Sequence, residues 1–338
     1  MREKIDIAIK DALARLGTEN VPFVVERPRA MEHGDYATNA ALVGKVDARA
    51  LADKLGTIDG VAKVEVVGKF INFFLSREAL VPQPQAIAQI YAGKKVMVEY
   101  TDPNPFKEFH IGHLMSNTIG ESIARLFEVS GAMVERANYQ GDVGLHVAKA
   151  IWGKQQKPTA AWGDAYAYGS EQYEAHKDEV DALNKVIYDK SDSAVNALYD
   201  EGRAASLVHF EDIYKKLDTA FVHYFFESQT AEPGLTLVRG NMGDVFQESE
   251  GAIIYPGEQD GLHTRVFINK AGLPTYEAKD LGLLSLKAQT GTYDLSVTVT
   301  ASEQKEYFKV VLAAAKKISD VAGIAQMTRQ ITHGMMRF

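Results

Sequence analysis

The sequence contains no cysteine, which excludes disulfide bonds, thiolate metal sites and a cysteine nucleophile. This absence fits a reducing cytoplasm. No apolar run is long enough to cross a bilayer, and the segment Met1–Asp6 is too charged for a signal peptide. We therefore expect a soluble cytoplasmic protein without a membrane partner.

An excess of basic residues is also lacking. The 37 lysine and arginine residues are outnumbered by 45 aspartate and glutamate residues, which gives a formal net charge of −8. This balance argues against a protein that coats nucleic acid through a basic surface, although it leaves room for a local basic patch. Apolar residues make up 46% of the 338 residues, enough for a sizeable core, and the length favours two or more domains.

The N-terminal part of the chain has the pattern of a small α/β domain. Ile5 and Ile9 fall on one face of a helix over residues 2–16, which Gly17 ends. We place the N-terminal domain at residues 1–80 and a proline-containing linker at residues 81–92. The other expected elements are a strand over 21–26, a loop over 28–35, a largely helical stretch over 36–55, and strands over 64–67 and 70–75.

A second pattern begins at residue 93. A strand over 95–100, a helix over 111–130 and a strand over 133–138 form a βαβ unit, which implies a parallel sheet. The same alternation of strands and helices is predicted later in the chain, with strands over 265–269, 294–300 and 325–332 and helices over 276–289 and 303–319. We predict an α/β fold with one doubly wound parallel sheet in two halves, residues 93–153 and 251–338. The polar stretch over 154–250, with a helix expected over 207–226, is interpreted as a mainly helical insertion that splits this sheet.

The loop after the first strand of the predicted sheet carries the residues most suited to chemistry. His110 and His113 lie three residues apart at the start of a helix, so both can face one anion. Gly112 lacks a Cβ and lets a base or phosphate approach the backbone, and Lys107 adds positive charge. Two histidines at this spacing also occur on ordinary surfaces or in zinc sites, but no third ligand is adjacent. The position after a strand favours a nucleotide site without a protein-bound metal.

The same segment resembles a known family. The letters His110-Ile111-Gly112-His113 are the HIGH signature of class I aminoacyl-tRNA synthetases. Residues 98–114, 138–144, 276–282 and 302–304 resemble the arginyl enzymes of this class, and residues 33–40 and 70–75 look like their additional N-terminal domain. The resemblance implies a Rossmann catalytic domain of the HUP type and the activity of an arginine–tRNA ligase, with L-arginine, ATP with Mg²⁺, and tRNA(Arg) as partners.

The resemblance also assigns an amino-acid site. A guanidinium is a planar fork of donors that carboxylates meet best. Positions matching Glu99, Tyr276 and Asp280 face the arginine side chain in the family, and those matching Asn104 and Gln304 bind its α-amino end. If each residue is considered alone, without the resemblance, the ordinary interpretations differ. Glu99 would be a surface charge at a strand end, Asp280 a solvated acid on a helix and Tyr276 a core residue.

Further roles follow for the nucleotide and the tRNA. His110 and His113 would hold ATP phosphates in catalysis, Gly112 would make room for adenosine, and Lys107 would assist, unless it is a solvated loop charge. Phe70 and Asn72 match positions that contact the D-loop of tRNA. Without the resemblance, Phe70 would be interpreted as a core residue and Asn72 as a residue that hydrogen-bonds within a turn. Some relatives make a further polar contact nearby, and the matching position in this sequence is Val67.

Some features depart from the family pattern. Met115 replaces a usual arginine and Val143 a common tryptophan. Residues 331–338 resemble the approach to the second class I signature, the KMSKS loop, and the chain stops before that loop and before an anticodon-binding domain. We therefore expect a truncated monomer with impaired adenylate formation. The alternatives are a small nucleotidyltransferase and a non-catalytic relative that binds arginine or RNA.

Overall fold

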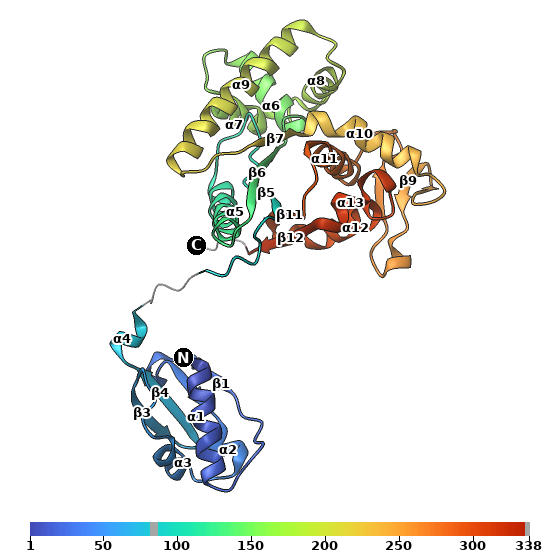
Figure 1. Cartoon of the computed structure of the whole chain (residues 1–338). Coiled ribbons are helices and arrows are strands. Elements are labelled where there is room, and N and C mark those ends of the chain that lie inside the picture. Colours follow the sequence, from blue (N-terminus) through green and yellow to red (C-terminus); the bar gives the residue numbers. More distant parts are fainter. Residues whose placement is uncertain (82–86, 335–338) are drawn as a thin grey trace. The chain divides into compact units, whose positions relative to one another are not determined.

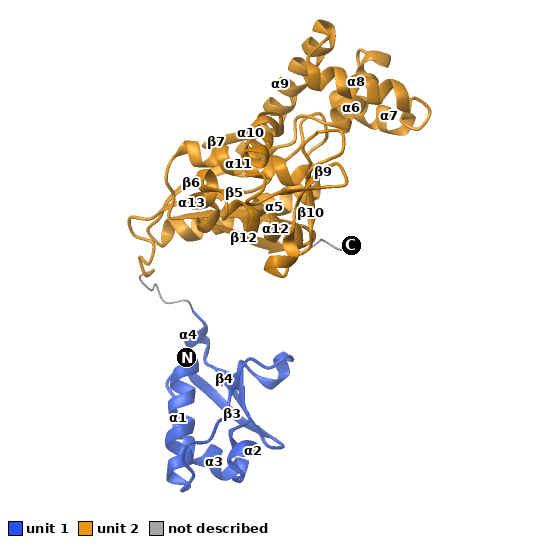
Figure 2. Cartoon of the chain, turned by 90° about the vertical axis from the view of Figure 1, so that its right-hand side faces the viewer, with its two compact units in different colours: residues 1–86 blue, residues 87–338 orange. Residues whose placement is uncertain are grey.

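The chain forms two compact units in a computed structural model that describes residues 1–81 and 87–334. One unit comprises residues 1–86 and the other residues 87–338. Figure 1 follows the chain through both units, and Figure 2 colours them separately. The predicted linker over 81–92 lies in part outside the described residues, because 82–86 are not among them.

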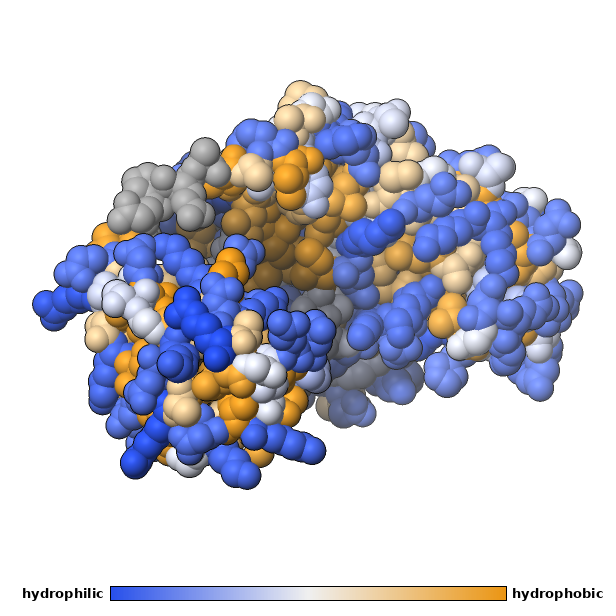
Figure 3. Space-filling view, turned by 60° about the horizontal axis from the view of Figure 1, so that its bottom comes forward, coloured by the Kyte–Doolittle hydropathy of each residue, from blue (hydrophilic) through white to orange (hydrophobic). Residues whose placement is uncertain are grey.

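Hydrophilic residues predominate on one face of the molecule. Figure 3 shows one face on which hydrophilic residues dominate and hydrophobic residues lie between them. None of the helices in the described part of the chain has the length and apolar character needed to span a membrane.

The first unit packs helices on one four-stranded antiparallel sheet of order β1-β2-β4-β3. Ile5 and Ile9 of α1 and Ile71 and Phe73 of β4 are fully buried in its core, because apolar residues recur on the inner face of each element. Its elements are α1 (Arg2–Arg15), β1 (Val25–Glu26), η1 (Met31–His33), β2 (Tyr36–Thr38), α2 (Ala40–Gly44), α3 (Ala48–Leu55), β3 (Val61–Val67), β4 (Phe70–Leu75) and α4 (Arg77–Leu80).

Two predictions for this unit are wrong in part. The strand predicted over 21–26 is reduced to β1, and the helical stretch predicted over 36–55 begins with strand β2. Pairing with β4 decides the second case, since Tyr36 lies opposite Phe73 in the antiparallel ladder. Tertiary pairing therefore overrides the local preference of this short segment.

The second unit contains a five-stranded parallel sheet, which confirms the predicted fold class. Its strands are β5 (Lys95–Glu99), β6 (Met133–Gln140), β7 (His223–Phe226), β11 (Leu295–Ala301) and β12 (Thr328–His333), in the order β12-β11-β5-β6-β7. The chain runs outward from β5 to β7 on one side and through β11 to β12 on the other. The order therefore reverses between β5 and β11, the place where ligands bind in such sheets.

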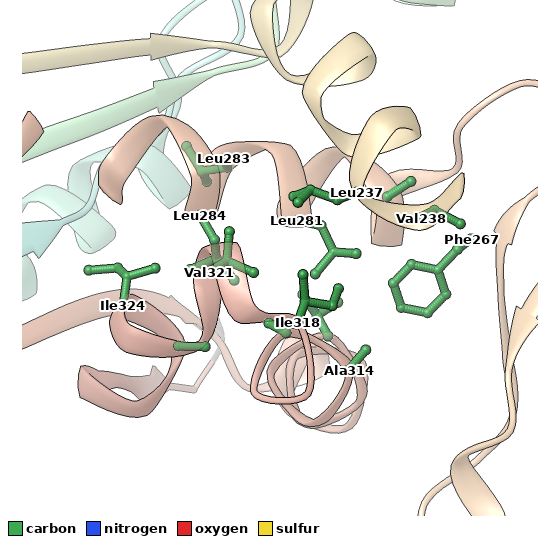
Figure 4. Close-up of a cluster of buried hydrophobic side chains, with 14 of the residues drawn as sticks. Leu237, Val238, Phe267, Leu281, Leu283, Leu284, Ala314, Ile318, Val321 and Ile324 are labelled. Atoms are coloured by element: carbon green, nitrogen blue, oxygen red, sulfur yellow. The ribbon is translucent and has the colours of Figure 1, made fainter. Parts of the chain in front are cut away.

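Helices cover both faces of the parallel sheet. Val96 and Val98 of β5 pack with α5 (Ile111–Val129) on one face, and Met97 packs into a larger core on the other. Figure 4 shows this larger core, which includes Leu281 and Ile318. It is formed largely by α10 (Glu227–Gly240), α11 (Tyr276–Thr290), α12 (Lys305–Ala315) and α13 (Ser319–Met327).

The helix predicted over 207–226 ends earlier than expected. Helix α9 ends at Lys216, and residues 223–226, predicted as helix, form β7 and pair in parallel with β6. The helical part has its own core, built around Phe106 and Ile151, and its helices lie together at one end of the unit in Figure 1. They are α6 (Leu145–Gln156), α7 (Trp162–Gln172), α8 (Lys177–Asp189) and α9 (Ser193–Lys216).

Two later segments also differ from the prediction. Strand β10 (Arg265–Ile268) exists but belongs to a separate antiparallel sheet with β8 (Gln247–Ser249) and β9 (Ala252–Tyr255), which η2 (Gly257–Asp260) follows. The helix predicted over 303–319 is divided into η3 (Ser302–Gln304), α12 and the start of α13, and β12 begins only at Thr328.

Candidate active site

Two cavities adjoin each other where β5 and β11 end, and a third adjoins the first of them. The carboxylate cavity, of about 520 Å³, is lined by Glu99, Asp102 and Asp280 with their neighbours. The histidine cavity, of about 600 Å³, contains His110 to His113. A side chamber of about 400 Å³ lies beside α6, α7 and α8. They occupy the crevice that the strand order predicts for a ligand site.

The carboxylate cavity brings together all five residues that the sequence assigned to arginine. Their side chains come from β5, the loop after it, α11 and η3, which are far apart in the chain. The five are Glu99, Asn104, Tyr276, Asp280 and Gln304. Their grouping is observed, and their role stays a prediction.

Glu99 is paired with a lysine that the sequence analysis missed. Lys287 Nζ lies 2.8 Å from Glu99 Oε2, and the two side chains are only 2% and 3% exposed. Thr298 Oγ1 of β11 is a further acceptor for the ammonium, at 3.4 Å. Glu99 is therefore a buried member of an ion pair and not a surface charge, and the pair neutralises part of the cavity floor.

Asp280 has no such cation among the described residues. Its Oδ2 accepts a hydrogen bond of 2.6 Å from the hydroxyl of Tyr307. Burial raises the pKa of Asp280 to about 7, and the negative charges of Glu99 and Glu227 oppose its ionisation further, although Tyr307 and Lys287 favour the ionised form. The carboxyl is thus much harder to ionise near neutral pH than a solvated aspartate, and a bound cation would favour its ionised form.

Three neutral residues complete this cavity. Tyr276 stands at its rim and is 71% exposed, so it is not a core residue. Asn104 approaches the backbone of Gly141, where an added Cβ would lie 2.4 Å from its Oδ1. Gln304 lines both the carboxylate and the histidine cavity, as do Asp102 and Thr300. These shared residues mark the junction of the two cavities.

The two histidines of the signature stack on each other, with ring centroids 3.7 Å apart and ring planes 18° apart. The backbone N–H of Gly112 donates to His110 Nδ1 at 3.1 Å, and the backbone N–H of His110 donates to His113 Nδ1 at 3.3 Å. Because each Nδ1 accepts a hydrogen bond, the neutral rings carry their hydrogen on Nε2. Both imidazoles can therefore donate from Nε2 to an anion.

Burial lowers the pKa of His113 to about 4, and the neighbouring His110 and Lys107 lower it further. His113 is therefore a neutral donor near pH 7. A side chain on Gly112 would come within 3.0 Å of the His110 ring, so glycine at this position preserves the stacked arrangement.

The loop over residues 101–110, which leads from β5 into the HIGH signature and is called the signature loop, is held in strained backbone conformations. Thr101, Asp102 and Phe106 have φ values of 79°, 49° and 70°. Contacts with three elements hold them: the Thr101 N–H donates to Ser116 of α5, the Tyr139 N–H to Asp102, and the Phe106 N–H to Ser206 of α9. The helical insertion therefore fixes one end of this loop.

Phe106 fills an aromatic socket in the insertion. It is 1% exposed, with its ring centroid 5.3 Å from Trp162 and 5.8 Å from Tyr199. Lys107, the next residue, extends into the side chamber, where its Nζ lies 5.2 Å from the ring centre of Tyr166. The structure thus places Lys107 in a different cavity from the histidines with which the sequence grouped it.

The two residues assigned to tRNA lie in the first unit. Phe70, 45% exposed, follows the turn between β3 and β4, so it is not a core residue. Asn72 is 3% exposed and lies within the sheet, in register with Ala37 and Glu65. Val67, opposite Phe70, is 44% exposed.

The residues that depart from the family pattern also reach the site. Met115 lines the histidine cavity and Val143 the side chamber. Residues 1–81 and 87–334 contain no cluster of three or more histidine, aspartate or glutamate side chains able to hold a metal ion.

Several lining residues were missed by sequence reasoning. Lys287 follows Asp280 by seven residues, two helical turns, so helical spacing could have found it. Asp102 lies inside the signature loop itself. The other lining residues, which come from other elements, are Tyr139, Glu227 and Tyr307. No local sequence pattern predicts that they line the cavity.

Comparison with known proteins adds relatives to this geometry. An arginine–tRNA ligase of Limosilactobacillus reuteri is 27% identical over 94% of this chain and 61% of its own length. One from Lactococcus lactis is 28% identical over 89% of this chain and 58% of its own length. The chain thus spans about 60% of the length of these curated relatives.

Solved structures share the fold. The arginyl-tRNA synthetase of Thermus thermophilus superposes with a TM-score of 0.61 at 21% identity, covering 99% of this chain and 66% of that one. The enzyme from Plasmodium falciparum gives 0.60 at 19% identity, covering 98% and 64%.

Family models cover nearly the whole chain. Residues 3–75 match the family described as arginyl tRNA synthetase N-terminal domain. Residues 76–337, well over half of the chain, match the family described as tRNA synthetases class I (R), catalytic domain. The chain therefore belongs to the class I tRNA synthetase family of the arginyl type.

Proposed function

We propose that the second unit carries the amino-acid activation site of an arginine–tRNA ligase. One observation carries the proposal: a cavity with buried carboxylates opens into a cavity with two histidine donors, and Asp102, Thr300 and Gln304 line both. An amino acid with a cationic side chain and a nucleotide would meet at that junction. The relatives bear the name arginine–tRNA ligase, which supports the same assignment.

The reaction would proceed in two steps. The carboxylate of arginine attacks the α-phosphorus of ATP in line, forming an acyl–phosphate bond and releasing pyrophosphate. A ribose hydroxyl at the 3′ end of tRNA(Arg) then attacks the acyl carbon, and AMP leaves. No side-chain nucleophile is needed, so positioning and charge stabilisation supply the catalysis.

The histidine cavity would hold the nucleotide. Nε2 of His110 and His113 would donate to phosphate oxygens, and the N-terminus of α5 would add its favourable dipole. Gly112 would leave room for the adenosine. Mg²⁺ would arrive with the ATP phosphates and neutralise part of their charge. Lys107, in the adjoining side chamber, would add long-range positive charge.

The carboxylate cavity would select arginine. Asp280 would receive the guanidinium, with the exposed ring of Tyr276 as a wall and the Glu99–Lys287 pair beneath. Gln304, at the junction, and Asn104, where the cavity borders the side chamber, would bind the α-amino end. Neutral amino acids of the same shape would leave Asp280 without a partner and would bind weakly.

The first unit would contact the tRNA. The match to the arginyl tRNA synthetase N-terminal domain supports this role. Phe70 is the accessible member of the predicted pair and can stack on a base, whereas Asn72 reaches the surface little. We therefore expect Phe70 to contribute more to RNA binding than Asn72.

Calorimetric titration with L-arginine tests the proposal, with citrulline and L-lysine as ligands of altered charge and shape. Arginine should bind selectively, and Asp280→Asn should abolish that selectivity. Asp200→Asn, which removes an exposed carboxylate on α9, is the matched control and should bind as the unaltered chain does. Equal binding of arginine and citrulline would refute the assignment. Arginine binding without ATP–pyrophosphate exchange would favour a non-catalytic arginine-binding protein instead.

A further inference from the structure

Asp102 is neither part of the HIGH signature nor one of the five residues assigned to bind arginine. It lies in the signature loop and lines both the carboxylate and the histidine cavity. If the proposed function holds, on which this inference rests, arginine extends from Asp280 toward the bound nucleotide. The α-carbon of the amino acid, with its ammonium and carboxylate, then lies at the junction beside Asp102.

The Asp102 carboxylate is fixed but only partly used. Its Oδ1 accepts a hydrogen bond of 2.7 Å from the backbone N–H of Tyr139. In the part of the chain that the structure describes, no donor reaches Oδ2 and no lysine or arginine forms an ion pair with this residue. The backbone of Asp102 has a φ of 49°, an uncommon conformation that the surrounding loop contacts maintain.

The charges around the cavity leave two carboxylates without a cation. Glu99 is paired with Lys287 in the floor. Two further pairs lie at the wall, Lys279 with Glu227 and Arg265 with Glu277. Among the described lining residues, this leaves Asp280 and Asp102 as the carboxylates without a cationic partner. Free arginine brings two positive groups, a guanidinium and an α-ammonium, at its two ends.

Both unpaired carboxyls resist ionisation while the cavity is empty. Burial raises the pKa of Asp102 well above its ordinary value, and the negative charge of Glu99 raises it further, against the opposing hydrogen bond from Tyr139. A cation at Oδ2 would restore the ionised form. Ammonium binding at this position would therefore have a strong electrostatic driving force.

We propose that Asp102 is the counter-ion of the α-ammonium group, so that the cavity recognises two cationic groups of one ligand, the guanidinium at Asp280 and the ammonium at Asp102. Asn104 and Gln304 then supply neutral hydrogen bonds around the same group. A guanidino compound whose amino group is acylated lacks the second charge and is a poor ligand.

The variant Asp102→Asn tests this assignment. Asparagine keeps an oxygen for the Tyr139 N–H, removes the negative charge, and tolerates the positive φ of this position. The unaltered chain and the variant are titrated with L-arginine, agmatine and Nα-acetyl-L-arginine. Agmatine keeps both positive groups without the carboxylate, whereas Nα-acetyl-L-arginine keeps the guanidinium and the carboxylate but has no α-ammonium group.

The expected result is a selective loss. Arginine and agmatine should bind Asp102→Asn about 10- to 100-fold more weakly, the effect of removing a charged hydrogen-bond partner. Nα-acetyl-L-arginine should bind both proteins equally. Equal weakening of all three ligands, or of none, would overturn the proposal. Thermal unfolding shows whether the variant is folded, and Asp102→Gly, which also accepts positive φ, serves for the same comparison if it is not.

Asp280→Asn separates the two proposals. All three ligands carry a guanidinium, so this variant should weaken them all. If Asp280→Asn weakens arginine and Asp102→Asn does not, the inference about Asp102 fails and the arginine site stands. If the unaltered chain does not bind arginine, the proposed function fails and the inference fails with it.

Discussion

The carboxylate and histidine cavities lie at the same edge of the same sheet, yet burial acts on them with opposite consequences. In the first, it raises the pKa of Asp280 to about 7 and holds back a negative charge. In the second, it lowers the pKa of His113 to about 4 and holds back a positive one. Both cavities thus carry less charge when empty than their residue types indicate. One cavity gains charge when a cation enters, and the other meets an anion with neutral donors.

The largest effect should come from breaking the ion pair beneath the first cavity. Lys287→Met leaves Glu99 buried without a partner and should lower the free energy of unfolding by about 3–5 kcal/mol. Urea denaturation of the two proteins measures this difference. The double variant Glu99→Gln/Lys287→Met should recover most of it. A single variant as stable as the unaltered chain would show that Glu99 ionises little or reaches water.

Removing a histidine should affect the second cavity alone. His113→Ala deletes one Nε2 donor and should weaken binding of a non-hydrolysable ATP analogue about tenfold, with arginine binding unchanged. Fluorescence titration with the analogue measures the change. His263→Ala, in an exposed segment between η2 and β10, is the matched control. If arginine binding fell as much as nucleotide binding, the two cavities would not be separable.

Changing the pH should sharpen the contrast. Arginine binding requires ionised Asp280 and, by the inference above, ionised Asp102, so its affinity should rise with pH until both carboxyls are ionised. The part of this rise that depends on Asp280 should end at about pH 7 and amount to at most about tenfold per pH unit. The groups that set this pKa are Glu99, Glu227, Lys287 and Tyr307. Between about pH 6 and 8, His113 stays neutral and contributes no change to nucleotide binding. Calorimetry across this range checks both; a flat arginine profile would refute the role of Asp280.

The smallest effect should appear where both cavities share a support. Ser206→Ala removes the acceptor for the Phe106 N–H and should cost about 1 kcal/mol of folding stability, which urea denaturation measures. Because the signature loop serves both cavities, arginine and nucleotide binding should weaken together by a few-fold. Ser193→Ala, at the exposed start of the same helix, is the matched control. A change in one ligand only would show that the loop parts move independently.

Periodicity and local signatures predicted much of this arrangement. The apolar run Val96–Val98 marked a central strand, and the capping histidines marked the start of α5. Tyr276 and Asp280 are four residues apart in the helix predicted over 276–289, a spacing that puts them on one helical face, and the structure brings both to the carboxylate cavity. These features depend on neighbours in the sequence, so sequence spacing could find them.

The failures depend on distant partners. Strands β2 and β7 are short, and their pairing with β4 and β6 decides their conformation. The sequence could not show that Lys287 reaches Glu99, or that Lys107 extends into another chamber, because both contacts depend on tertiary packing. The cytoplasmic location and the monomeric state stay predictions.

The strained signature loop has a consequence for how the protein is made. Its three uncommon backbone conformations are maintained by α5, by β6 and by Ser206 of α9, which lies 100 residues after Phe106. A growing chain on the ribosome therefore lacks the last of these supports until α9 has emerged. Tyr276, Asp280 and Gln304 of the carboxylate cavity are made later still, so we expect the signature loop to become ordered in a growing chain before that cavity is complete.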